Sequence, residues 1–77
     1  MSLDELAKGD LAIVKSIDCD DELKHRLFSF GLMRGVKIKV KEFSLKKKTI
    51  EIEIGRSHIA LRLDEAKKIE VEHQCKI

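Results

Sequence analysis

The chain has 77 residues, 39% of them charged, with a formal net charge of +2, which is too small to indicate nucleic-acid binding by itself. This length allows one domain, residues 1–77, and two cysteines far apart in sequence exclude a dense disulfide framework. The sequence contains neither an apolar run of the ~20 residues that span a bilayer nor a signal peptide, so we expect a cytoplasmic protein without a transmembrane segment.

The first predicted elements are a capped helical turn and a strand. Ser2 and Glu5 have the spacing of a capping box, in which the glutamate side chain reaches back to the backbone N–H of the serine. Residues 11–17 form an apolar run of strand length. Because side chains alternate along a strand, Ala12 and Val14 should share one face of it.

A short amphipathic helix should follow. Residues 18–21 supply N-cap candidates and negative charge, which are favourable at a helix N-terminus. Leu23, Leu27 and Phe30 fall at i, i+4 and i+7 and predict the buried stripe of a helix over residues 23–30. Gly31 comes directly afterwards, where helices commonly end with a residue at positive φ.

Two glycines bracket the connection from this helix to the next strand. Gly31 and Gly35 enclose residues 32–34, and the alternation typical of a strand begins at Val36. The chain must turn sharply over this short connection. We therefore predict that both glycines adopt turn conformations that other residues adopt only at a cost.

The next two strands should form a hairpin. Residues 36–43 and 49–54 both alternate between apolar and polar side chains, and they flank a five-residue loop. Pairing Phe43 with Thr49 gives two cross-strand ion pairs on the outer face, namely Lys39 with Glu53 and Lys41 with Glu51. Strict alternation would turn Glu42 inward, so a bulge is expected near that residue.

The remaining sequence predicts a strand over residues 58–63, a helical turn over residues 64–67 and a short strand over residues 69–72. Residues 73–77 should form a mobile tail. Five short strands with one short helix indicate a mainly β chain that forms a small, partly open antiparallel barrel.

The helix-to-strand connection resembles a known family. Residues 26–38 are similar to the Leu-x-x-Leu-Gly-Leu-x-x-Gly-x-x-Val segment of FeoA proteins, with Phe30 at a position that is usually leucine. Leu6-x-x-Gly9 resembles the start of that family, and residues 59–71 resemble its end. The resemblance implies an SH3-like barrel and a small cytosolic accessory or regulatory protein of ferrous iron uptake. It also implies binding to FeoB, a membrane transporter with a cytosolic GTPase domain; a homo-oligomer is left open.

The residues give no sign of catalysis or of a dedicated metal site. No serine lies in a nucleophile motif, and residues 31–35 lack the lysine and hydroxyl of a phosphate-binding loop, so we expect no enzyme and no cofactor. The candidate metal ligands lack zinc-site spacing, and we therefore predict no metal site. These candidates are Cys19, His25, His58, His73 and Cys75.

Two groups of residues are predicted to bind a partner. Phe28 lies off the apolar stripe of the helix and, with Met33 and Arg34, would place apolar area beside a positive charge. The second group is the hairpin loop tip, where one apolar residue precedes three cations: Leu45, Lys46, Lys47 and Lys48. The alternatives are that the helix crosses the barrel mouth and buries Phe28, and that the tip is an ordinary solvated loop.

Two other functions are consistent with a small barrel. Residues 34–48 contain seven basic side chains and one acidic side chain, which favours single-stranded nucleic acid. All three aromatic residues are phenylalanines, however, and Phe30 and Phe43 are expected in the core, so we expect no nucleic-acid partner. The third hypothesis is a metal-responsive module similar to the SH3-like tail of iron-dependent repressors.

Overall fold

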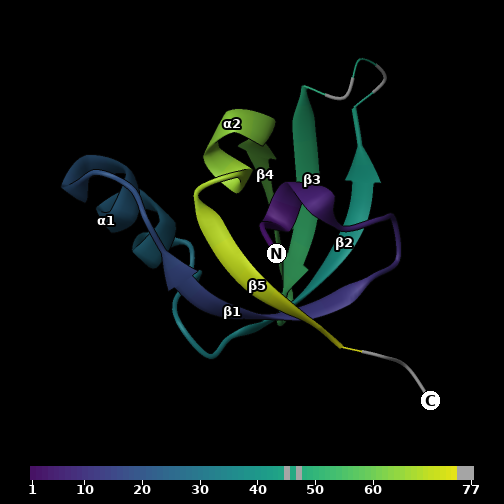
Figure 1. Cartoon of the computed structure of the whole chain (residues 1–77), viewed down its shortest axis with the longest axis horizontal. Coiled ribbons are helices and arrows are strands. Elements are labelled where there is room, and N and C mark those ends of the chain that lie inside the picture. The colour runs from purple at the N-terminus through teal and green to yellow at the C-terminus, as the bar shows by residue number, and fades with distance from the viewer. Residues whose placement is uncertain (45, 47, 75–77) are drawn as a thin grey trace.

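A five-stranded antiparallel sheet forms most of the molecule (Figure 1). The computed structural model describes residues 1–44, 46 and 48–74. The strands are β1 (Leu11–Ile17), β2 (Lys37–Phe43), β3 (Thr49–Ile54), β4 (Ser57–Arg62) and β5 (Ile69–Gln74). The helices are η1, a short 3-10 helix (Leu3–Glu5), α1 (Asp21–Ser29) and α2 (Leu63–Ala66).

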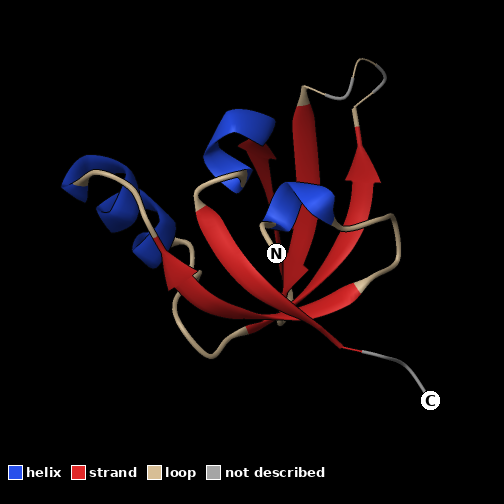
Figure 2. Cartoon of the chain, in the orientation of Figure 1, coloured by secondary structure: helices blue, strands red, loops and turns tan. Residues whose placement is uncertain are grey.

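The sheet is curled but not closed. Its order is β4-β3-β2-β1-β5, so within the described residues the two edge strands do not pair with each other. The strands curve around η1, α2 connects the two edge strands, and α1 lies at the periphery of the molecule (Figure 2). The prediction of a mainly β chain with one short helix, folded as a partly open barrel, is confirmed.

The core follows the alternation of the strands. Ala12 and Val14 share the buried face of β1, as their spacing predicts. Leu3, the first residue of η1, and Leu6, directly after it, are also buried and close the core at the N-terminal end. The other buried apolar residues of the strands are Ile38, Val40, Ile50, Ile52, Leu61, Ile69 and Val71.

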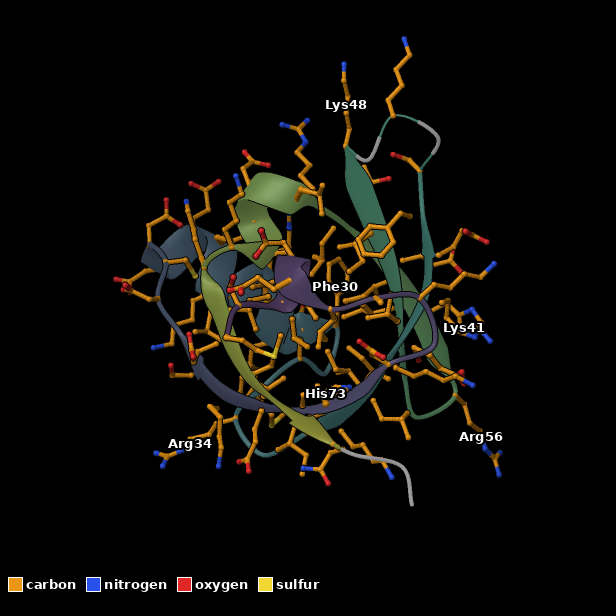
Figure 3. All side chains as sticks on the ribbon, turned by 45° about the vertical axis from the view of Figure 1, so that its right-hand side comes forward. Phe30, Arg34, Lys41, Lys48, Arg56 and His73 are labelled. Atoms are coloured by element: carbon orange, nitrogen blue, oxygen red, sulfur yellow. The ribbon has the colours of Figure 1, made fainter. Side chains whose placement is uncertain are left out.

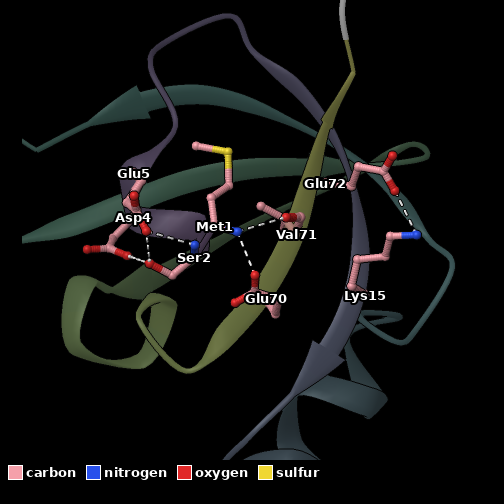
Figure 4. Close-up of polar contacts among 8 residues, drawn as sticks. All are labelled: Met1, Ser2, Asp4, Glu5, Lys15, Glu70, Val71 and Glu72. Atoms are coloured by element: carbon pink, nitrogen blue, oxygen red, sulfur yellow. Dashed lines mark hydrogen bonds and ion pairs between the residues drawn. The ribbon is translucent and has the colours of Figure 1, made fainter.

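The N-terminal residues cover the outer edge of β5 (Figure 4). The Val71 N–H donates to the Met1 carbonyl at 2.8 Å, and Ser2 forms a β-bridge with Glu70. The Ser2 N–H donates to Glu5 Oε1 at 3.0 Å, as the predicted capping box requires. Because these residues occupy backbone groups of β5, that edge is partly protected from pairing with another chain.

The β2–β3 hairpin contains the predicted bulge, and the bulge changes one of the predicted ion pairs. Lys39 lies opposite Glu53, as expected. Lys41 is the extra residue at the register shift, so it does not face Glu51, and its Nζ lies 3.7 Å from a Glu53 oxygen instead. The prediction for Lys41 is therefore wrong. The pairs beyond the bulge are Glu42 with Glu51 and Phe43 with Ile50, not Phe43 with Thr49.

The last two elements differ from their predicted bounds. The helical turn begins at Leu63 rather than Asp64, with Arg62 as its N-cap. β5 continues through His73 and Gln74, both of which pair with β1, so the prediction of a mobile tail is wrong for these two residues. Residues 75–77 lie outside the described part of the chain.

Candidate functional site

A groove where α1, the α1–β2 link and β1 meet brings three of the predicted partner-binding residues together. Phe28, Met33 and Arg34 all line it, and the groove has a volume of about 450 Å³. The side chains of Phe28 and Met33 are 60% and 37% exposed, so Phe28 is not buried by the barrel mouth. The other lining residues are Lys15, Ser16, Ile17, Lys24 and Leu32.

The end of α1 explains the exposure of Phe28. Gly31 has φ +91°, and its N–H donates to the Phe28 carbonyl at 2.9 Å. The Leu32 N–H donates to the Leu27 carbonyl at 3.0 Å, which completes a Schellman motif. Leu27 and Leu32 are both fully buried. The motif therefore directs the chain inward at Leu32, while Phe28 stays on the outer face of the helix.

Phe30 does not occupy the core position predicted for it. The helix runs from Asp21 to Ser29, and Phe30 is its C-cap residue, with a side chain that is 42% exposed. The chain turns at Gly31, and Leu32 takes the buried position instead. The expectation that Phe30 is core is wrong, because the helical period does not extend past the last helical residue. Because Phe30 is exposed, its expected burial no longer argues against the stacking of nucleic-acid bases on this protein.

A second turn attaches the α1–β2 link to β1. The Val36 N–H donates to the Met33 carbonyl at 3.2 Å, and Gly35, at the third position of this turn, has φ +89°. The Gly35 N–H donates to the Val14 carbonyl at 2.8 Å. This bond holds Met33 and Arg34 beside β1. As a result, residues 15–17 form one wall of the groove.

The groove also contains two cations that the sequence did not reveal as site residues. Lys15 comes from β1 and Lys24 from the first half of α1. Only the tertiary structure brings them beside Phe28, and no local motif marks either lysine. Lys15 Nζ lies 2.7 Å from a Glu72 carboxylate oxygen (Figure 4), and this lysine holds the pKa of Glu72 below its ordinary value.

The hairpin tip lies at the other end of the molecule. Figure 3 shows Lys48 at one end of the view and Arg34 at the opposite end. Lys46 and Lys48 are exposed, whereas Leu45 and Lys47 lie outside the described residues. The two predicted groups of partner-binding residues therefore do not form one continuous surface.

The candidate metal ligands are scattered. Within residues 1–44, 46 and 48–74, no group of three or more His, Cys, Asp or Glu side chains is placed to hold an ion. His58 lies 3.5 Å from Glu51, and His73 lies 3.5 Å from Asp10. His25 is exposed, Cys19 is partly buried against the core, and Cys75 is not among the described residues.

We expect that removing metal ions does not destabilise the fold. A structural metal supplies folding free energy directly, so chelation lowers the melting temperature of a protein that depends on one. The melting temperature measured by circular dichroism should be the same with and without EDTA. A marked decrease in EDTA that added zinc or iron reverses would reveal a structural site.

Cys19 should react slowly with alkylating reagents. Burial raises the pKa of its thiol above the ordinary value, and the nearby carboxylate of Asp20 acts in the same direction. Because the thiolate is the reactive form, a raised pKa lowers the reactive fraction at any pH below it. In a Cys75→Ser variant, iodoacetamide at about pH 8 should modify the folded protein several-fold more slowly than the urea-unfolded protein. Equal rates would contradict this.

Comparisons with known proteins identify relatives along nearly the whole chain. The model of the FeoA domain family matches residues 1–73. The Fe(2+) transport protein A of Campylobacter jejuni is 45% identical over 71 residues, which cover 92% of this chain and 96% of that protein. The corresponding protein of Helicobacter pylori strain 26695 is 37% identical over 73 residues and covers 94% and 96% of the two chains.

Solved structures share the fold. The FeoA protein from Chlorobium tepidum has a TM-score of 0.93 at 35% identity, over 97% of this chain and 71% of that one. The zinc complex of FeoA from Stenotrophomonas maltophilia, described as a procaryotic SH3 domain protein, has a TM-score of 0.81 at 26% identity, over 94% and 89%. The SH3-like fold is thereby confirmed. No helix in the described residues is both long and apolar enough to cross a membrane.

Proposed function

The chain belongs to the FeoA family of non-enzymatic accessory proteins of ferrous iron transport, and we propose that it acts in the cytoplasm by binding the membrane transporter FeoB. An accessory protein without catalytic machinery acts through its surface. We assign the contact to the cytosolic part of the transporter, where a small SH3-like domain can bind through loops and grooves.

The exposed apolar groove is the observation that carries this proposal. Phe28 and Met33 both line it and are among the exposed large apolar side chains, whereas none of the described strand residues is an exposed large apolar one. Exposed apolar side chains gathered beside a cation such as Arg34 are typical of protein-binding hot spots, because they offer area to bury and charge to orient the partner. A single exposed phenylalanine would not indicate a binding site, because isolated apolar side chains are common on protein surfaces.

The test is direct binding to the cytosolic domain of FeoB. The purified protein should co-elute with that domain in size-exclusion chromatography, and calorimetry should give a dissociation constant. The measurement is made with and without guanine nucleotide, because the GTPase domain can present different surfaces in its two states. If neither nucleotide state binds at concentrations up to ~100 μM, at the weak end of specific association, the proposal is wrong.

The hairpin tip should affect the rate of association more than the lifetime of the complex. Exposed cations at a rim steer an acidic partner over long range, and salt screens this effect. Replacing Lys46 and Lys48 together by glutamate should slow association several-fold at low salt and much less at ~0.5 M salt. Stopped-flow or biosensor kinetics would measure it. The matched control reverses Lys37 and Arg56, two exposed cations outside the tip.

A further inference from the structure

The groove beside Phe28 has an unusual charge composition. Three of its lining residues are cationic, Lys15, Lys24 and Arg34, and none of its described lining residues is acidic. The whole chain, by contrast, has nearly balanced charge, with 16 basic and 14 acidic residues. The groove is therefore a local concentration of positive charge, not a sample of the average surface.

Two of these cations are free to receive a ligand. Lys15 already forms an ion pair with Glu72. Lys24 and Arg34 are exposed, and neither forms an ion pair with another described residue. They come from α1 and from the α1–β2 link, the two segments that also carry Phe28 and Met33. Positive charge thus accompanies the apolar side chains of the groove, where apolar walls strengthen the local potential.

We propose that this groove binds a short acidic segment of the transporter that carries a large apolar side chain. The apolar side chain packs against Phe28 and Met33, and the flanking carboxylates pair with Lys24 and Arg34. This assignment rests on the proposed function, and it specifies which part of the partner is bound. The groove volume of about 450 Å³ falls within the ~300–1,000 Å³ of small-molecule pockets, so the groove has room for one large apolar side chain.

The charge of the groove excludes other parts of a membrane transporter. Loops that adjoin the membrane on the cytoplasmic side are rich in lysine and arginine, and the groove would repel them. A bare metal cation is disfavoured for the same reason. The contact is therefore expected at an acidic stretch of the cytosolic domain or tail, away from the membrane-proximal loops.

The first experiment uses synthetic peptides with the isolated protein. The probe is a fluorescein-labelled, helix-forming peptide with leucines at i and i+4 flanked by glutamates. One control peptide replaces its glutamates with lysine, and the other replaces its leucines with alanine. Fluorescence anisotropy should show that the first peptide binds at least ~tenfold more tightly than either control. Amide shifts in ¹⁵N-labelled protein should concentrate at residues 15–17 and 28–34.

Protein variants locate the peptide. Phe28→Ala and Arg34→Glu should each weaken binding about tenfold, because they remove the apolar contact or reverse the charge. The matched controls are Phe30→Ala and Arg56→Glu, which change an exposed phenylalanine and an exposed arginine outside the groove. Both should stay within about twofold of the parent. If Phe28→Ala proves unstable, Arg34→Glu still tests the groove, since its side chain is exposed.

The same variants assayed against the FeoB cytosolic domain separate the two proposals. If the domain binds the parent and all four variants equally, the proposed function stands and the groove assignment is wrong. If the acidic peptide binds in the groove but the domain does not bind at all, the proposed function is wrong and the groove's preference stands. Equal binding of all three peptides would overturn the acidic-segment proposal. So would a protein that binds phosphatidylserine vesicles and does not bind the acidic peptide.

Discussion

Replacing Leu27 by alanine should lower the free energy of unfolding by about 3 kcal/mol, within the range for leucine truncations in well-packed cores. Among the residues of α1, all of which the structure describes, Leu27 is the only buried one. Its carbonyl also accepts the Leu32 N–H in the Schellman motif. Leu27 is therefore the main apolar attachment of a peripheral helix, and alanine would leave a cavity in the core.

Urea denaturation followed by circular dichroism would measure this change. Leu23→Ala is the matched control, because Leu23 lies one helical turn away and is only partly buried, so it should cost clearly less. The Arg26 Nη2–Glu65 Oε2 contact, which joins α1 to α2, involves an exposed arginine and cannot compensate for the loss. A cost below about 1 kcal/mol for Leu27→Ala would mean that α1 is held mainly by other contacts.

Gly31→Val and Gly35→Val should each destabilise the fold by about 2 kcal/mol. The cause is backbone strain, not crowding. A Cβ on Gly31 would meet only Ile54 Cγ2, at 4.0 Å, and one on Gly35 would have no described neighbour within 4 Å. Both residues nevertheless have φ near +90°, which valine adopts only at a high cost.

Asparagine provides the control at these two positions. It tolerates positive φ better than valine, so Gly31→Asn and Gly35→Asn should recover a large part of the lost stability. A simple loss of space would instead make asparagine and valine, which have similar volumes, equally harmful. Unfolding midpoints that do not change in the valine variants would show that the connection can adopt another conformation.

Strand alternation made most of the sheet predictable. β3 has its predicted bounds because its apolar residues at every second position can bury one face only as a strand, and β1 has its predicted bounds because its apolar run has strand length. The N-terminal capping interaction was also predictable, since it depends on two residues three positions apart. A bulge near Glu42 followed from the inward position that strict alternation would give to that residue. The sequence did not show that Lys41 is the extra residue, and the predicted ion pair of Lys41 with Glu51 was wrong for that reason.

The candidate site was less predictable because it depends on how separate segments meet. The exposure of Phe28 followed from its place off the helical stripe. The same stripe placed Phe30 in the core, since sequence periodicity does not show at which residue a helix ends. Lys15 and Lys24 carry no local signal at all. Lys15 meets the groove because the Gly35–Val14 hydrogen bond fixes the link against β1, and Lys24 because of where α1 lies.

The pairing of β1 with β5 also has a consequence for how the chain folds. β1 is the first strand in chain order and β5 the last, yet they pair along most of their length. During synthesis β2, one neighbour of β1, is made before β5, so the other edge of β1 stays unpaired until β5 leaves the ribosome. Such non-local pairing places small β-rich domains among the slower two-state folders, with folding times of about milliseconds to seconds. Over that interval, the unfinished sheet presents the edge of β1 to any other nascent chain.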